Sequence, residues 1–173
     1  MKIVDKLKEI IDPTSYRGSA IEYGSAPEAL YGNSLFDYEI NNWKVICIQK
    51  DRDCFDELRI FRRFAYHLEC SEGGCLSVDE AIGRINLEDI QILLIKNTDD
   101  PISVLEGFSL EKRKTQVVCV QQEDDSESRK ELTLHLDRRG FRLHERVLVS
   151  DIYIRKIEQA DTRLEFSESI FEV

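Results

Sequence analysis

One segment near the middle of the chain, residues 90–108, most constrains what the chain can fold into. Residues 90–96 read I-Q-I-L-L-I-K, a run too short for an ordinary helix and rich enough in isoleucine and leucine for a strand buried on both faces. Such a strand lies at the centre of a sheet. A polar turn over residues 96–100 then leads to Pro101, a residue favoured at the first helical position because its missing N–H would have no partner there.

The residues after this turn have the spacing of a helix. Ile102, Leu105 and Phe108 recur at helical intervals, and Gly107 is suited to end the helix. A buried strand, a polar turn and a helix make half of a βαβ unit, and in open parallel sheets ligands bind at that turn. The sequence therefore predicts a ligand site at the carboxyl end of this strand.

The same alternation of strands and helices runs through the chain. It predicts an α/β fold with right-handed crossovers and a mostly parallel sheet covered by helices on both faces. The first helix is expected to cover a sheet edge, and the last two strands are expected to form an antiparallel pair at an edge. The expected helices are 3–11, 28–40, 53–66, 77–85, 101–108 and 126–139, and the expected strands are 20–23, 44–49, 66–70, 90–96, 116–121, 141–144 and 147–156.

The length of 173 residues and the hydrophobic content of 42% predict one domain that can bury a core without disulfides or structural metals. Its parts are an N-terminal helix (1–12), a core (19–156) and a C-terminal tail (157–173). Three interpretations of the tail stay open: a last strand or docking segment on the domain's own sheet, a dimerisation element, or a partly disordered end. Its apolar residues are Leu164, Phe166, Ile170 and Phe171.

The formal charge is −10, from 34 acidic and 24 basic residues. This charge repels phosphate backbones, and no lysine or arginine cluster reverses it, so nucleic acid is not an expected partner. No run approaches the 18 apolar residues of a membrane span, and the first residues alternate charged with apolar groups instead of forming a signal-peptide core. We therefore expect a cytoplasmic protein whose partner is a small molecule or another protein.

The cysteines and histidines do not form a recognisable reactive site. Five cysteines, at positions 47, 54, 70, 75 and 119, are an odd and scattered set that does not fit a disulfide framework, so reduced thiols are expected. Cys70 and Cys75 have a spacing that a metal or redox pair uses, yet no second Cys/His pair completes a zinc site. The three histidines are too dispersed in the sequence for one of them to be identified as a catalytic base. We expect neither a metal site nor an identifiable catalytic residue.

Three stretches resemble one known family. Residues 20–58, beginning A-I-E-Y-G-S-A-P, resemble the opening of FkbM-type S-adenosylmethionine-dependent methyltransferases, which carry D-I-G-A followed by a G-W-x-G-I-x-I-E-P-N-P strand. Residues 92–121 look like the family's I-D-V-E-G block with its V-L-x-G-F helix, and residues 138–156 look like its C-terminal hairpin. The resemblance covers about residues 19–156. It implies a Rossmann-like class I methyltransferase fold with a C-terminal antiparallel hairpin, and S-adenosylmethionine as the cofactor.

The resemblance also assigns cofactor-binding positions, either functional or vestigial. Glu22 and Gly24 match the acid and the glycine of D-I-G-A, a turn that lets the backbone approach a ligand closely. Gln49 stands where the family's acidic residue binds the ribose hydroxyls, and Asp51 stands two positions later. Lys96 stands where I-D-V-E-G has its aspartate.

The I-D-V-E-G block is the most altered. Besides Lys96, Thr98 replaces its glutamate and Asp99 replaces its glycine. We expect Lys96 to be a solvated cation paired with Asp99 or Asp100, or else to hold an anionic ligand. Loss of the family's acids predicts a divergent member that is non-catalytic or repurposed. The alternative is an active O-methyltransferase that acts on a hydroxyl of a small molecule or sugar.

Overall fold

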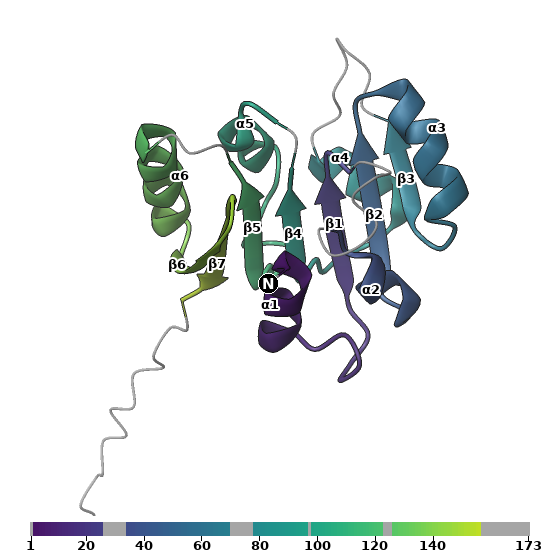
Figure 1. The fold of residues 1–173 in the computed structure, drawn as a ribbon, viewed down its shortest axis with the longest axis horizontal. Helices are drawn as coiled ribbons and strands as arrows, with labels where there is room; N and C mark the ends of the chain where they lie inside the picture. The colour runs from purple at the N-terminus through teal and green to yellow at the C-terminus, as the bar shows by residue number, and fades with distance from the viewer. Residues whose placement is uncertain (1, 26–33, 70–77, 97, 123–125, 157–173) are drawn as a thin grey trace, which may run out of the picture.

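A computed structural model describes residues 2–25, 34–69, 78–96, 98–122 and 126–156 (Figure 1). Seven strands form one sheet in the order β3-β2-β1-β4-β5-β7-β6. The strands are β1 (Ser19–Tyr23), β2 (Lys44–Gln49), β3 (Tyr66–Glu69), β4 (Ile92–Ile95), β5 (Val117–Gln121), β6 (Phe141–Val147) and β7 (Ser150–Arg155), and the helices are α1 (Ile3–Ile10), α2 (Phe36–Ile40), α3 (Arg52–Phe61), α4 (Val78–Ile85), α5 (Pro101–Glu106) and α6 (Ser126–Arg138).

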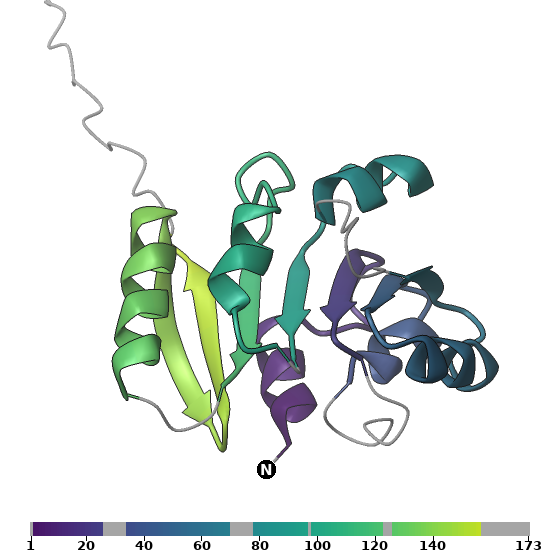
Figure 2. The same ribbon diagram turned by 90° about the horizontal axis from the view of Figure 1, so that it is seen from above.

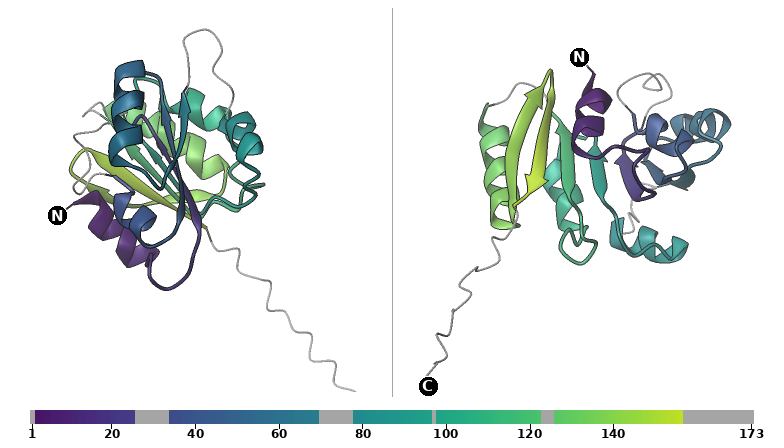
Figure 3. Two further views of the ribbon diagram at one scale, coloured as in Figure 1. Left: turned by 90° about the vertical axis from the view of Figure 1, so that its right-hand side faces the viewer. Right: turned by 90° about the horizontal axis from the view of Figure 1, so that it is seen from below.

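The first five strands pair in parallel, while β7 is antiparallel to both β5 and β6. The strand predicted to be central is β4, the fourth of seven, and all its residues are buried. Figures 2 and 3 show α1 to α3 on one face of the sheet and α4 to α6 on the other. The predicted mostly parallel sheet, with helices on both faces and a closing antiparallel pair, is confirmed.

Two apolar clusters form the core, one on each face of the sheet. One contains buried residues of α4, α5 and α6 together with those of the strands beneath them. The other contains Leu7 of α1 together with Leu94 of β4 and Cys119 of β5. The prediction that the first helix covers a sheet edge is wrong, because α1 lies over the middle of the face (Figure 1).

Two other boundaries differ from the predictions. The helix predicted over 53–66 ends at Phe61, and Phe64, which lies within the predicted range, is 78% exposed. The helix predicted over 28–40 is observed only as α2, and residues 28–33 lie outside the described part of the chain. Cys70, Cys75 and the tail (157–173) also lie outside it. Within the described residues, no helix has the length and hydrophobicity that a membrane span requires.

Candidate functional site

The order of the strands identifies the place where a ligand site is expected. The chain runs from β1 outward to β2 and β3, and then returns to β4 on the other side of β1. In open α/β sheets, ligands bind outside the carboxyl ends of the strands where the order reverses in this way. The candidate site is therefore the edge formed by the carboxyl ends of β1, β4 and β2.

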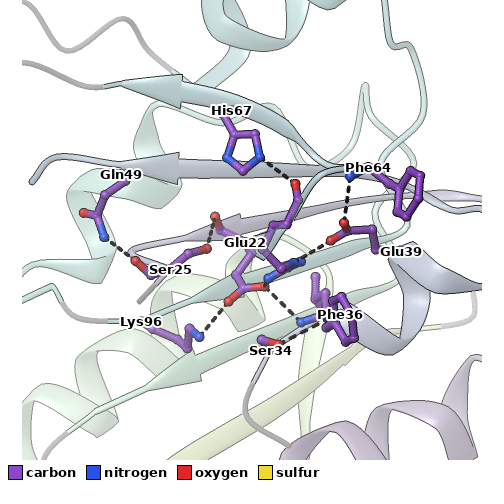
Figure 4. Close-up of polar contacts among 11 residues, drawn as sticks. Glu22, Ser25, Ser34, Phe36, Glu39, Gln49, Phe64, His67 and Lys96 are labelled. Atoms are coloured by element: carbon purple, nitrogen blue, oxygen red, sulfur yellow. Dashed lines mark hydrogen bonds and ion pairs between the residues drawn. The ribbon is translucent and has the colours of Figure 1, made fainter. Parts of the chain in front are cut away.

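Glu22, near the end of β1, is completely buried. Its Oε1 lies 2.7 Å from Nζ of Lys96, and its Oε2 lies 3.1 Å from Nη1 of Arg62. The backbone N–H of Leu35 also donates to Oε2, at 2.9 Å (Figure 4). A buried carboxylate is strongly unfavourable unless it is paired and hydrogen-bonded, and Glu22 has both kinds of partner.

Lys96 follows β4 directly and is only 2% exposed. Its backbone N–H donates to the carbonyl oxygen of Tyr23 at 2.9 Å, so the chain after β4 stays beside β1. The expectation of a solvated cation paired with Asp99 or Asp100 is wrong, because the side chain turns inward to Glu22. Asp100 instead caps α5, where its Oδ1 accepts a hydrogen bond from the N–H of Ser103.

Arg62 and Glu39 extend the charged network. Arg62 is fully buried, and its Nε donates to Oε2 of Glu39. The other Glu39 oxygen accepts a hydrogen bond from the N–H of Phe64 at 3.1 Å. The result is a buried row of alternating charges in the order Lys96, Glu22, Arg62 and Glu39 (Figure 4).

This row of charges controls the protonation of Glu22. Burial by itself raises the pKa of the carboxyl group, but the charges of Lys96 and Arg62 and the N–H of Leu35 outweigh burial and lower the pKa to about 2. Opposite charges within a few ångströms favour the ionised form in this way. Glu22 is therefore an anion at neutral pH and cannot serve there as a proton donor.

Gln49, at the end of β2, uses its side chain to connect two turns. Its amide nitrogen donates to the carbonyl oxygen of Ser25, in the turn after β1. Its amide oxygen accepts from the N–H groups of Lys50, at 2.6 Å, and Asp51, at 3.1 Å. Ser25 in turn donates from its hydroxyl to the carbonyl oxygen of Glu22 at 3.3 Å. The side chain of Gln49 thus spans the gap between the two turns (Figure 4).

Gly24 and Asp51 complete the set of residues predicted from the sequence. Gly24 has a φ of +73°, a conformation that glycine adopts without strain, and its N–H donates to the carbonyl oxygen of Ile48 at 2.9 Å. Asp51 is exposed and is the N-cap of α3, where its Oδ1 accepts from the N–H of Cys54 at 2.9 Å. The hydrogen bond from Cys54 lowers the pKa of Asp51.

The five predicted positions all lie at the carboxyl ends of β1, β2 and β4. The side chains of Glu22 and Lys96 are in direct contact, and the side chain of Gln49 accepts from the backbone of Asp51. Sequence reasoning missed Arg62 and Glu39. A signal for a missing counter-charge was present, because Glu22 is the one charged residue in the apolar strand predicted at 20–23. The sequence did not show which cation would supply that charge.

Cys47, Cys54 and Cys119, the cysteines that the structure describes, have free thiols. Cys47 and Cys119 are buried, and burial raises the pKa of the Cys47 thiol to about 12, so it is an unreactive small apolar group. His67 donates from Nε2 to the carbonyl oxygen of Arg62 at 2.7 Å. Within the described residues, no three His, Cys, Asp or Glu side chains are grouped in a way that could hold a metal ion.

No protein-family model matches the chain, and no curated protein matches it by sequence. Solved structures do match. The METTL16 methyltransferase domain aligns with a TM-score of 0.63 and 13% identity, over 88% of this chain and 65% of that one. A precorrin-6y C5,15-methyltransferase from Geobacter metallireducens aligns with a TM-score of 0.58 and 10% identity, over 88% of each chain.

A third match is a TehB-like S-adenosylmethionine-dependent methyltransferase from Corynebacterium glutamicum, with a TM-score of 0.56 and 13% identity over 87% of this chain and 86% of that one. The chain has the Rossmann-like class I methyltransferase fold. Identities this low show the fold alone, and they do not single out the FkbM-type family. The chain spans about two thirds of the METTL16 domain that it matches.

Proposed function

We propose that this chain is an FkbM-like methyltransferase-fold protein that has exchanged its cofactor site for internal contacts and now has a non-catalytic or repurposed role. The observation that carries the proposal is the buried ion pair between Glu22 and Lys96. It joins β1 to the residue after β4, across the point where the strand order reverses. Ligands of this fold class bind at that point.

The position that binds ribose in related folds supports the same conclusion. An acidic residue there offers two charged oxygens to the ribose hydroxyls. Gln49 offers one neutral oxygen, which already accepts two backbone N–H groups. A ribose would have to displace these bonds, and losing one charged hydrogen bond costs roughly 1.5–3 kcal/mol. At about 1.4 kcal/mol for each factor of ten, this single change weakens binding by roughly tenfold to a hundredfold.

Charge reversal after β4 adds to this effect. Lys96 places a buried cation where the FkbM pattern has an aspartate, and that cation is used to neutralise Glu22. The observed side chains of Glu22, Gln49 and Lys96 therefore do not fit S-adenosylmethionine in the way that the family pattern implies. The FkbM kinship is part of the proposal and depends on residues 20–58, 92–121 and 138–156.

A second candidate is an active methyltransferase that transfers a methyl group from S-adenosylmethionine to a hydroxyl of a small molecule or sugar. The observation in its favour is Gly24, which keeps the left-handed turn and the close backbone approach after β1. The fold itself supports this general activity. The two candidates differ in whether the cofactor binds.

Calorimetric titration of the whole chain with S-adenosylmethionine and with S-adenosylhomocysteine separates them. The proposed function predicts no saturable heat at about 1 mM ligand, the level at which a binding free energy of about −4 kcal/mol becomes detectable. Micromolar binding that disappears in a Gly24→Val variant, while an Arg63→Ala variant retains it, would establish the second candidate instead.

A further inference from the structure

A groove is lined by residues of α6 and by Arg146 of the edge strand β6. These two elements lie at the opposite end of the sheet from β3 and α3 (Figures 1 and 3). Its volume is about 500 Å³. This size is within the range of clefts that hold ligands or peptide side chains. Its described lining consists of Ser126, Arg129, Lys130, Thr133, Leu134 and Arg146.

The groove is positively charged, in contrast to the protein as a whole, whose formal charge is −10. Three of its six described lining residues are cationic. Two of them are held in place by Asp151, a buried residue of β7. Arg146 donates to both oxygens of Asp151, at 2.6 and 3.3 Å, and Nε of Arg129 lies 3.9 Å from one of them. One buried acid thus positions two arginines, and Lys130 adds a third positive charge.

Apolar surface lies in the groove and on the neighbouring part of β6. Leu134 of α6 is 58% exposed, and Leu143 of β6 is 42% exposed. Leu143 lies opposite Tyr153 of β7, whose hydroxyl is hydrogen-bonded to Thr133 of α6 at 3.0 Å, so Leu143 is on the α6 side of the sheet. Leucines beside fixed cations suit a peptide segment that carries both acidic and apolar side chains.

The last seventeen residues of the sequence, 157–173, have that composition. They contain five acidic residues and one arginine. The apolar residues Leu164, Phe166, Ile170 and Phe171 are interspersed with acids and serines. An acidic, apolar segment of this kind is complementary in charge and in apolar character to the groove.

The point where this segment begins allows it to reach the groove. The N–H of Lys156 donates to the carbonyl oxygen of Gly140 at 2.8 Å, so the last described residue lies beside the start of β6. From Phe141 to Arg146 the strand covers roughly 17 Å at about 3.4 Å per residue. Eight extended residues span roughly 26 Å, which is enough to bring Leu164 to the groove with some length to spare.

We propose that residues 157–173 bind in cis to this groove, with acidic side chains beside Lys130 and Arg146 and with Leu164 and Phe166 against Leu134 and Leu143. This arrangement covers β6, the strand at the sheet's edge. An uncovered edge strand exposes N–H and C=O groups that promote pairing with other chains, and proteins commonly cover such edges. The inference does not depend on whether the protein binds S-adenosylmethionine.

Hydrogen exchange of the full chain, followed by mass spectrometry, tests the proposal. The groove variant combines Lys130→Glu with Leu134→Ser, and the tail variant combines Leu164→Ser with Phe166→Ser. Both sets of changes are at exposed groove positions or outside the described domain, so the fold is preserved. We expect the amides of β6 to exchange at least about tenfold faster in each variant than in the unchanged chain.

A matched control uses the exposed aromatic residue at the other end of the sheet. Phe64→Ser removes an apolar side chain that is also open to a partner, and it leaves exchange in β6 unchanged if the groove is the docking site. Unaltered β6 exchange in both the groove and the tail variants would overturn the proposal. Protection that rises with protein concentration, together with a doubled mass in light scattering, would place the tail on a second copy and would also overturn it.

Discussion

Nζ of Lys96 lies 2.7 Å from Oε1 of Glu22, and both side chains are buried. Glu22 and Lys96 are 74 positions apart in the sequence. Glu22 belongs to β1 and Lys96 directly follows β4, so they lie on the two sides of the point where the strand order reverses. An acid on β1 thus obtains a counter-charge from a lysine that is distant in the sequence. The charged side chains at this site are therefore neutralised by one another.

Removing one partner of this pair is expected to be costly. Lys96→Met leaves Glu22 buried with a single cation, and breaking a buried ion pair destabilises a protein by about 3–5 kcal/mol. Combining it with Glu22→Gln removes the unpaired charge, so the double variant is expected to be more stable than the sum of the single effects implies. Urea denaturation measures all three variants.

A matched control is Lys114→Met, which breaks an exposed pair with Asp89. The free energy of unfolding is expected to change by less than about 1 kcal/mol, because exposed pairs contribute little. Strictly additive effects of Lys96→Met and Glu22→Gln would contradict the direct contact between the two side chains.

Acid is expected to weaken the fold through Glu22. Its pKa is about 2 in the folded chain and 4.5 ordinarily. Because the folded pKa is the lower of the two, the ion pairs contribute stability above pH 4.5, and this contribution is lost as the pH falls toward 2. Its size is on the order of 3 kcal/mol. Between pH 5 and pH 2.5 the unchanged chain should lose clearly more stability in urea than Glu22→Gln does, and equal losses would exclude this role of Glu22.

Asp51 is expected to act as a helix cap. Its carboxylate accepts a hydrogen bond from the N–H of Cys54, and replacing an N-cap aspartate with alanine costs about 1 kcal/mol. Asp53→Ala, in the first turn of the same helix, changes no cap and should cost clearly less. Thermal unfolding measures both variants. Equal stabilities of the two would show that the cap bond contributes nothing.

Replacement of glycine by alanine is expected to have opposite effects on stability at Gly18 and at Gly83. A Cβ at Gly18 would lie 2.7 Å from the ring of Trp43 and 2.8 Å from Oε1 of Gln91, so Gly18→Ala is expected to cost about 1–3 kcal/mol through overpacking. Gly83 lies within α4 and has open space around its Cβ position. Gly83→Ala is expected to stabilise by about 0.5–1 kcal/mol, because alanine favours a helix interior. This account would be contradicted if the urea midpoints of both variants were higher, or both lower, than the midpoint of the unchanged chain.

Much of the fold could be predicted because local patterns and the sheet agree. The apolar run at 90–96 became the central strand β4, and Pro101 became the first residue of α5. Gly140 follows α6 with a φ of +80°, the left-handed conformation that glycine commonly adopts after the end of a helix. Each of these features depends on neighbouring residues, which a sequence shows directly.

The predictions that failed concern long-range contacts. The sequence predicted a helix over residues 53–66, but the chain leaves the helix at Arg62, whose side chain is held inside by Glu22 and Glu39. The residues that follow Lys96 are polar, so the sequence indicated a lysine at the surface. Its burial depends instead on its position beside β1. A buried charge is stabilised by partners distant in sequence, which a local pattern does not reveal.

The most direct test of the central claim is a crystal structure of the protein grown with S-adenosylhomocysteine at millimolar concentration. The account predicts that Lys96 remains paired with Glu22, that Gln49 remains hydrogen-bonded to Ser25, and that no nucleoside lies between the turns after Tyr23 and Ile48. A nucleoside bound in that place, with its ribose hydroxyls on Gln49, would contradict it.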